Sequence, residues 1–399
     1  MNGHVLVHSP IGGKLMTAPF KLLLAVAGLG ALVALGRFYL GLGAVSNLND
    51  GYPWGIWITF DVVIGTAIGC GSYAVALLAY ILNRGKYHPL VRPAILTSLL
   101  GYGLAVLAVT IDLGRFWGLW KIPIFYWRWT HSPQLEVALC VLAYILVLLV
   151  ELSPALFEKL RARPRTGLRA WEERGLRFVD RSLVWLLPLG LLLPTMHQSS
   201  LGTMMLLPGP RMHPLWFTPW LPFLFLVNCL AIGYAVVVLE ASFSAAVFGR
   251  RRETAILASL SRVAAWVALF WVAFRLVEVA VAGKLPLVAG ATGIAFLAEI
   301  LLAVAGAAIL LSEERRARPV WQVRAAILLL LAGSLFRFNT YLVAFRPGQH
   351  WSYFPTVPEL LITVGIFAFE VALYIAAVKT FPILSGAAPA VAPAREVIP

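Results

Sequence analysis

The sequence predicts an all-α fold, a polytopic bundle of about ten transmembrane helices. Of the 399 residues, 60% are hydrophobic and 13% are charged, whereas a soluble domain is about 25% charged. The mean hydropathy is +0.85, which excludes an ordinary soluble globular domain. Apolar runs occupy most of the chain, so we expect residues 1–399 to form a single integral membrane domain.

Each predicted helix is an apolar run that can cross about 30 Å of hydrocarbon, which takes about 20 helical residues. Pro188 and Pro194 interrupt the fifth run, but neighbouring helices can satisfy the backbone groups that a proline frees. We expect no cleaved signal peptide, because no apolar segment or small-residue cleavage site precedes the first run. The runs lie near residues 20–40, 54–82, 92–114, 134–158, 183–203, 216–248, 255–282, 287–312, 319–345 and 357–381.

Lys and Arg are concentrated in one of the two sets of alternating loops. This set covers residues 84–92, 159–181, 250–262 and 315–324. The positive-inside rule places these loops and both termini on the cytoplasmic side of the membrane. The net charge of +14 therefore reflects topology, and no nucleic acid is expected as a partner.

The opposite loops, residues 47–57, 115–133, 206–220 and 346–358, are poor in charge and rich in aromatic residues. Trp and Tyr are enriched where a protein crosses the membrane surface, so an interfacial belt is one interpretation. They also dominate protein interfaces, so a docking surface for an extrinsic subunit is the other. The tryptophans of these loops include Trp117, Trp120, Trp127, Trp129, Trp216, Trp220 and Trp351.

Ionisable residues at membrane depth are functional candidates, because a charge inside a bilayer is costly. Asp61, Glu136 and His197 are predicted to lie in the outer half of the bundle, and no neighbour in the sequence neutralises them. We therefore expect these three side chains to surround one pocket and to be its catalytic residues. A hydrogen-bonded packing role is the alternative for His197.

Other charged residues have simpler explanations. Asp112 with Arg115, and Arg275 with Glu278, are spaced three residues apart and can pair on one helix face. Glu299 and Glu370 have no partner on their own helices, so we expect them to be protonated and hydrogen-bonded within the bundle.

Three carboxyls suggest a path for protons. Glu136 and Glu151 are 15 residues apart on one predicted helix, which corresponds to about 22 Å of rise. Together with Glu240 they predict an inner half-path for protons. Carboxyls that face small wet cavities are the alternative.

The chain offers few ligands for a metal cofactor. Among its seven histidines only His197 lies at membrane depth, so a bis-histidine haem is not expected. Cys70, Cys140 and Cys229 lie inside apolar runs and form no C-x-x-C pair, so we also expect no iron–sulfur cluster and no other metal in this chain.

Several strings resemble one family. They are residues 41–61 (GLGAVSNLNDGYPWGIWITFD), 83–93 (NRGKYHPLVRP), 110–115 (TIDLGR), 154–158 (PALFE), 193–200 (LPTMHQSS) and 353–356 (YFPT). The chain resembles the HybB-type membrane subunit of periplasmic-facing nickel–iron hydrogenases, within the wider NrfD and polysulfide reductase membrane-anchor family. The loop at residues 159–181 departs most from that pattern.

The resemblance implies ten helices, a quinone site toward the periplasmic face, no haem, and a ferredoxin-like iron–sulfur partner beside the large and small hydrogenase subunits. Hydrogen would be oxidised outside, and menaquinone or ubiquinone would be reduced in this chain. Asp61 and Glu136 would then supply protons, and His197 would donate a proton or a hydrogen bond. The other predicted site residues are Trp54, Trp57, Asp112 and Arg115 for quinone binding, and Glu151 and Glu240 for the proton path.

Two other functions remain open. Ten helices with buried carboxyls would also suit a proton-coupled secondary transporter, although no inverted repeat with matched broken helices is visible. The chain could also anchor another NrfD-type oxidoreductase that contains no hydrogenase.

Overall fold

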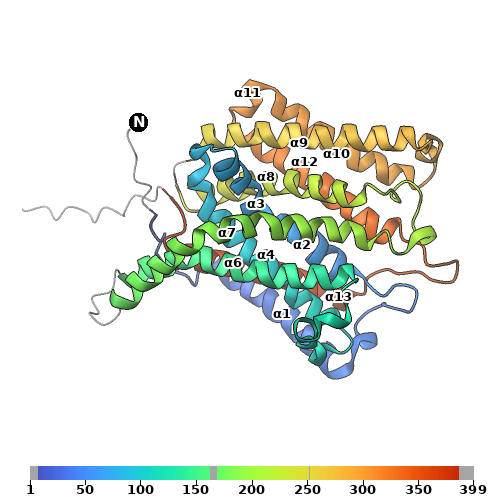
Figure 1. The fold of residues 1–399 in the computed structure, drawn as a ribbon, viewed down its shortest axis with the longest axis horizontal. Helices are drawn as coiled ribbons and strands as arrows, with labels where there is room; N and C mark the ends of the chain where they lie inside the picture. The colour runs from blue at the N-terminus through green and yellow to red at the C-terminus, as the bar shows by residue number, and fades with distance from the viewer. Residues whose placement is uncertain (1–7, 162–168, 251, 386–399) are drawn as a thin grey trace, which may run out of the picture.

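The computed structural model describes residues 8–161, 169–250 and 252–385. These residues form long helices that run side by side (Figure 1). Within these ranges, nine helices are long and apolar enough to cross a membrane, which confirms the predicted polytopic helical fold. They are Ala18–Leu40, Trp57–Ile81, Gly85–Asp112, Pro133–Leu160, Leu221–Val247, Thr254–Val281, Ala291–Leu311, Pro319–Val343 and Val357–Thr380.

The continuous long helices are α1 (Ala18–Leu40), α4 (Val91–Asp112), α6 (Pro133–Arg161), α7 (Arg169–Met204), α8 (Leu221–Val247), α9 (Thr254–Val281), α10 (Gly293–Leu311), α12 (Pro319–Phe338) and α13 (Val357–Thr380). The second span is composed of the π-helix η2 (Trp57–Ile64), α2 (Gly65–Ile68), α3 (Gly71–Ala76) and the π-helix η3 (Leu77–Ile81). A further π-helix, η10 (Asn339–Val343), follows α12.

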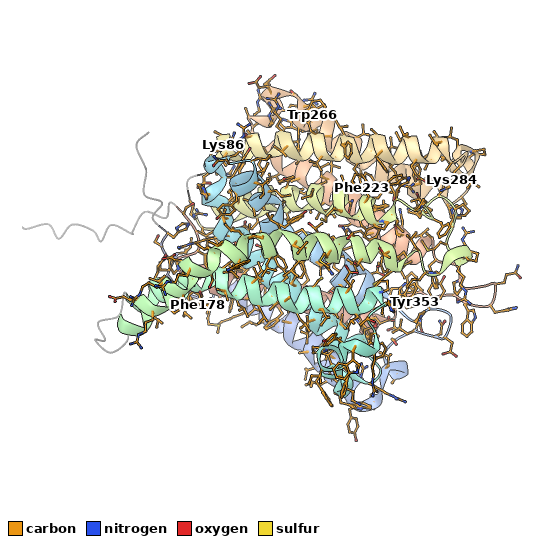
Figure 2. All side chains as sticks on the ribbon, in the orientation of Figure 1. Lys86, Phe178, Phe223, Trp266, Lys284 and Tyr353 are labelled. Carbon is orange, nitrogen blue, oxygen red and sulfur yellow. The ribbon has the colours of Figure 1, made fainter. Side chains whose placement is uncertain are left out.

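The predicted fifth span falls within α7, which is not among the nine apolar helices. Polar residues lie toward both ends of this helix: Arg174, Arg177, Asp180 and Arg181 precede its apolar middle, and His197, Gln198, Ser199 and Ser200 follow it. The helix nevertheless packs along α6 and α8 inside the bundle (Figure 1). Its first turns, where Phe178 lies, extend past the ends of α8 and α9 (Figure 2).

Both ends of the described chain lie at the same end of the bundle. The amides of Ile11 and Gly12 donate hydrogen bonds to the carbonyls of Val378 and Lys379, each at 3.1 Å. We call this the terminal end; Lys86 lies there, whereas Lys284 and Tyr353 lie at the opposite end (Figure 2). The assignment of the terminal end to the cytoplasm stays a prediction.

The first and last helices pack as a tight pair. A Cβ atom placed on Gly30 of α1 would lie 2.7 Å from the Cα of Gly365 in α13, so only glycines permit this approach. Small residues in membrane helices allow such close backbone packing. The pair completes one side of the bundle, next to α4.

The segment from Trp57 to Ile64 is a π-helix rather than an α-helix. π-Helical turns shift the register of a helix and often occur at functional sites. Asp61 lies in the middle of this turn and is 7% exposed. The local geometry therefore places a buried carboxyl in an irregular part of the second span.

Candidate functional site

A cavity of about 630 Å³ lies between the second span, α4, α8 and α13. Its wall is largely apolar, and three carboxyl side chains interrupt it: Asp61, Glu240 and Glu370. The predicted catalytic residue Asp61 and the predicted proton-path residue Glu240 thus line the same space. Sequence reasoning did not assign Glu370 to any site.

The cavity opens through the side of the bundle. Phe60, Phe243 and Phe367 line it and are 36%, 53% and 55% exposed. All three lie inside membrane-spanning helices, where an exposed side chain meets lipid. A molecule dissolved in the bilayer can therefore enter from the side.

Polar contacts hold two of the three carboxyls. The Thr363 hydroxyl donates a hydrogen bond to Oδ2 of Asp61 at 2.9 Å. Tyr374 donates a short hydrogen bond to Glu240. Thr363, Glu370 and Tyr374 follow each other along α13 at intervals of seven and four residues, so they share one helix face.

His197 lies in a separate, closed polar core. Its side chain is fully buried, and neither ring nitrogen has a hydrogen-bond partner among the described residues. The ring of Tyr102 contacts it at a centroid distance of 5.5 Å. The neighbouring Gln198 donates to Thr66 at 3.3 Å, which links α7 to the second span. His197 does not line the lipid-facing cavity that contains Asp61.

Hydroxyl groups extend this core toward the terminal end. The Tyr144 and Ser72 hydroxyls are hydrogen-bonded at 2.8 Å, and Ser98 donates to Ser72 at 2.7 Å. Glu151 follows Tyr144 by two turns of α6 and lies against α7, where a Cβ atom on Gly190 would be 3.3 Å from its Oε1. Together with the residues around His197, these groups form a row of polar side chains that is separate from the cavity, which we call the polar line.

The three predicted catalytic residues do not surround one pocket in the structure. Asp61 lines the cavity, and His197 lies in the closed core. Glu136 is half-buried in the first turn of α6, at the opposite end from Glu151, and lines no part of the cavity.

The two predicted wall tryptophans bind backbone carbonyls. The indole nitrogen of Trp57 donates to the Glu359 carbonyl at 3.2 Å, and that of Trp54 donates to the Tyr341 carbonyl at 3.1 Å. Neither side chain lines the cavity. Both fix the entrance of the second span against later helices.

The Glu359 carboxylate binds residues of two loops at the opposite end of the bundle. It accepts hydrogen bonds from the amides of Asn47 and Thr356 at 3.1 and 2.8 Å and from the Tyr353 hydroxyl at 2.6 Å. Thr356 and Glu359 form a capping box at the start of α13. Burial and this carboxylate raise the pKa of Tyr353 above its usual range.

The expected pairing of Asp112 with Arg115 is wrong. The α4 helix ends at Asp112 and Leu113 is extended, so Arg115 does not lie one turn further along the same helix. Arg37 of α1 instead donates to the carbonyls of Ile111 and Leu113, both at 2.5 Å, and so brackets Asp112. Arg115 is exposed outside the cavity.

Arg337 is a fully buried cation in α12. Its guanidinium donates to Asn228 Oδ1 at 2.8 Å, to the Phe225 carbonyl at 2.9 Å and to the Val63 carbonyl at 3.0 Å. Among the described residues, no carboxylate forms an ion pair with it. The contact with Val63 ties α12 to the π-helical turn that carries Asp61.

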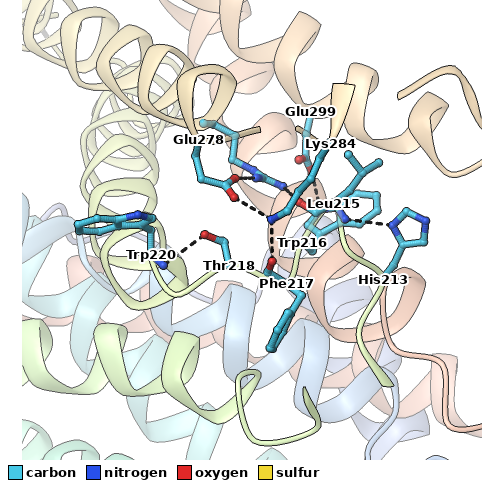
Figure 3. A network of polar contacts seen from close by, with 10 residues as sticks. His213, Leu215, Trp216, Phe217, Thr218, Trp220, Glu278, Lys284 and Glu299 are labelled. Carbon is cyan, nitrogen blue, oxygen red and sulfur yellow. Dashed lines mark hydrogen bonds and ion pairs between the residues drawn. The ribbon is translucent and has the colours of Figure 1, made fainter. Parts of the chain in front are cut away.

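A further polar network lies at the opposite end, between α9, α10 and the loop before α8 (Figure 3). Arg275 forms the predicted ion pair with Glu278, which Lys284 also contacts at 2.9 Å. Glu299 accepts hydrogen bonds from Asn339 at 3.0 Å and from Trp216 at 3.4 Å, so its partners come from other elements, as expected. Arg275 Nε and Glu299 Oε1 have no hydrogen-bond partner among the described residues. The network lies apart from the cavity.

The described residues do not fit a haem with two histidine ligands. In these ranges His197 lies deep in the bundle within α7, whereas His88 lies at the start of the Gly85–Asp112 span, near Lys86 at the terminal end. His213 is held in a loop by Thr292, 3.0 Å from its Nε2, and burial and Arg346 lower its pKa. No group of three or more His, Cys, Asp or Glu side chains suited to a metal occurs in the described ranges.

Comparison with known proteins identifies the family. The family described as "Polysulphide reductase, NrfD" matches residues 44–344. The chain belongs to this family. With its apolar helices, this makes it a multi-pass protein of the bacterial inner membrane.

Three curated relatives are similar. The probable Ni/Fe-hydrogenase 2 b-type cytochrome subunit of Escherichia coli (strain K12) is 37% identical over 385 residues, 94% of each chain. A Nitratidesulfovibrio vulgaris protein described only as "Protein" is 33% identical over 389 residues, 94% of this chain and 97% of its own. The menaquinone reductase integral membrane subunit of the same organism is 31% identical over 220 residues, 53% of this chain and 49% of its own.

The first relative's name includes the words b-type cytochrome, so the comparison lends no support to the expected absence of haem. That absence stays a prediction.

Proposed function

We propose that this chain is the quinone-reactive membrane subunit of a respiratory hydrogenase. It receives electrons from an iron–sulfur partner on the periplasmic side and passes them to menaquinone or a similar quinone. The names of two relatives, a hydrogenase subunit and a menaquinone reductase subunit, support this assignment. The observation that carries it is the lipid-facing cavity with Asp61 in its wall.

The cavity suits a quinone in size and chemistry. Ligand pockets are typically about 300–1,000 Å³, and this one is about 630 Å³. Quinones are confined to the bilayer, so a lateral opening bordered by Phe243 and Phe367 provides access. The apolar wall accommodates the ring and isoprenoid chain, and Asp61 offers a polar group to a ring oxygen.

Reduction of a quinone to a quinol consumes two electrons and two protons. A buried carboxyl favours its protonated form, so Asp61 can donate one proton to a quinone oxygen as electrons arrive. Thr363 then stabilises the carboxylate that remains, through its hydrogen bond to Oδ2. Asp61 is the catalytic residue of this proposal, and Trp57 is a positioning residue that holds the second span against α13.

The remaining predicted residues have supporting roles. His197 and Glu136 lie outside the cavity, and we place them with Glu151 on the polar line of the four-helix region formed by the second span, α4, α6 and α7. If protons for the quinone come from the cytoplasm while electrons come from the periplasm, turnover moves charge across the membrane. Each charge then works against about 2.3 kcal/mol per 100 mV.

The test uses the intact complex. Asp61→Asn keeps the size of the side chain but removes its exchangeable acid, so hydrogen-driven quinone reduction should fall at least tenfold. Hydrogen oxidation with benzyl viologen, which bypasses this chain, should stay at the wild-type rate. Unchanged quinone reduction in Asp61→Asn would refute the site, and substrate uptake by the isolated chain without electron transfer would favour a carrier.

A further inference from the structure

The last helix lies outside the part of the chain that matches the family. The match covers residues 44–344, whereas α13 runs from Val357 to Thr380. This helix nevertheless supplies a substantial part of the cavity wall, including Ile366, Glu370 and Tyr374. The family match alone therefore does not account for the polar side chains of α13.

Glu240 lies where two cavities meet. It lines the large cavity together with Ser244, and both residues also line a small cavity of about 20 Å³ nearer the terminal end. That volume is enough for about one water molecule. The small cavity is also lined by Arg250, Glu253 and Ser385.

Polar groups connect this small cavity to the surface at the terminal end. Ser385 donates to Oε1 of Glu253 at 3.1 Å, and Arg250 donates to the Ser385 carbonyl. Glu253 is partly exposed. A proton that arrives from solvent at Glu253 is thus one small cavity away from Glu240.

The next acceptors lie on α13. Tyr374 is hydrogen-bonded to Glu240, and Glu370 lies one helical turn from Tyr374 on the same wall of the cavity. At 1.5 Å per residue, Glu370 is about 6 Å along the helix from Tyr374 and about 10 Å from Thr363. Thr363 contacts Asp61, so along α13 Glu370 lies between the residue that binds Glu240 and the residue that binds Asp61.

We propose that Glu370 relays protons from the Glu240–Tyr374 pair to Asp61. The inference rests on the proposed function, because a reduced quinone is the final acceptor. A proton enters at Glu253, reaches Glu240, passes to Glu370 and restores the proton that Asp61 has given to a quinone oxygen. Each step transfers one proton between oxygen atoms. The relay runs twice for each quinone and so supplies both protons, and the two electrons come from the hydrogen that the complex oxidises.

The experiment measures hydrogen-driven quinone reduction by the intact complex in sealed vesicles of phosphatidylethanolamine and phosphatidylglycerol, with a pH dye inside. Only complexes whose terminal end faces the vesicle interior are assayed. They are recognised because their hydrogen-oxidising subunits, on the outside, reduce an acceptor that cannot cross the membrane. Glu370→Gln keeps the shape but cannot carry a proton. It should lower the turnover rate at saturating quinone at least fivefold, leave KM for quinone within twofold, and abolish proton uptake from the vesicle interior. Glu370→Asp should restore part of both rates.

Glu299→Gln is the control, since Glu299 is a fully buried carboxyl within a helix of the bundle but lies apart from the cavity, whereas Glu370 is half-buried in the cavity wall. It should leave proton uptake per quinol unchanged. Wild-type proton uptake from the interior in Glu370→Gln would overturn the relay. If the wild-type complex itself does not reduce quinone, or if Asp61→Asn reduces it normally, the proposed function fails instead.

Discussion

The Thr363 hydroxyl donates a hydrogen bond of 2.9 Å to Asp61, although the two residues are 302 positions apart in the chain. The bond joins the last membrane helix to the π-helical turn of the second span. Two distant parts of the sequence therefore define one wall of the cavity, and this contact is the first target for mutation.

Replacement of Thr363 by Val keeps the shape of the side chain but removes the donor. A hydrogen bond to a charged group contributes about 1.5–3 kcal/mol. Because the bond stabilises the Asp61 carboxylate left after proton donation, Thr363→Val should lower kcat for quinone about tenfold with little change in KM. Steady-state kinetics of the intact complex with a short-chain menaquinone measure this. Thr363→Ser keeps the hydroxyl and should stay close to the wild type; equal losses in both variants would show that packing, not the hydrogen bond, matters.

Arg337 should be important for stability. Arg337→Met would leave Asn228 and the carbonyls of Val63 and Phe225 without their donor. Unpaired buried polar groups cost about 1–3 kcal/mol each, so we expect a loss of about 3 kcal/mol or more. Thermal unfolding of the subunit in detergent measures the change. Arg337→Lys keeps the charge but lacks the several N–H donors of the guanidinium, so its stability should lie between those of the wild type and Arg337→Met. A melting temperature of Arg337→Met within 1 °C of the wild type would contradict this account.

The fold was predictable because membrane helices must satisfy their backbone groups internally, so hydropathy alone reveals them. The exception is α7, in which charged residues precede the apolar middle and polar residues such as His197 and Gln198 follow it. Glu278 pairs with Arg275 as the three-residue spacing predicted. The pairing of Asp112 with Arg115 failed because helix ends are not visible in spacing.

The site was predictable only in part. Asp61 and Glu240 were singled out, but their place in one cavity depends on how the second span, α8 and α13 pack together. The four-residue spacing of Glu370 and Tyr374 in the last apolar run was an available signal for the wall of α13. Nothing in the sequence indicates that Tyr374 binds Glu240, 134 positions away, because such contacts arise only from tertiary packing.

Haem content can be measured directly, and the name of the E. coli relative includes the words b-type cytochrome. The histidines in the described ranges offer a single residue at membrane depth, and its ring is packed beside Tyr102. We therefore expect the purified subunit to show less than one tenth of an equivalent of haem in a pyridine haemochrome assay. A full equivalent that disappears in His197→Ala but not in His350→Ala would show that this prediction is wrong.

The size of the cavity itself can be tested at Gly65. This residue lines the cavity, and a Cβ atom there would meet its nearest neighbour, the Phe60 carbonyl, at 3.6 Å, an ordinary contact. Gly65→Leu should therefore fold and fill part of the cavity. Loss of apolar contact for the quinone should raise its KM about tenfold or more, since each buried CH₂ contributes about 0.8 kcal/mol.

Gly103→Leu is the matched control, because Gly103 is also a helical glycine with open space around it but does not line the cavity. Quinone kinetics and viologen activity of both complexes measure the effect. A wild-type KM in Gly65→Leu, with normal assembly, would mean that the quinone binds elsewhere; an equal rise in Gly103→Leu would show that the effect comes from helix packing in general.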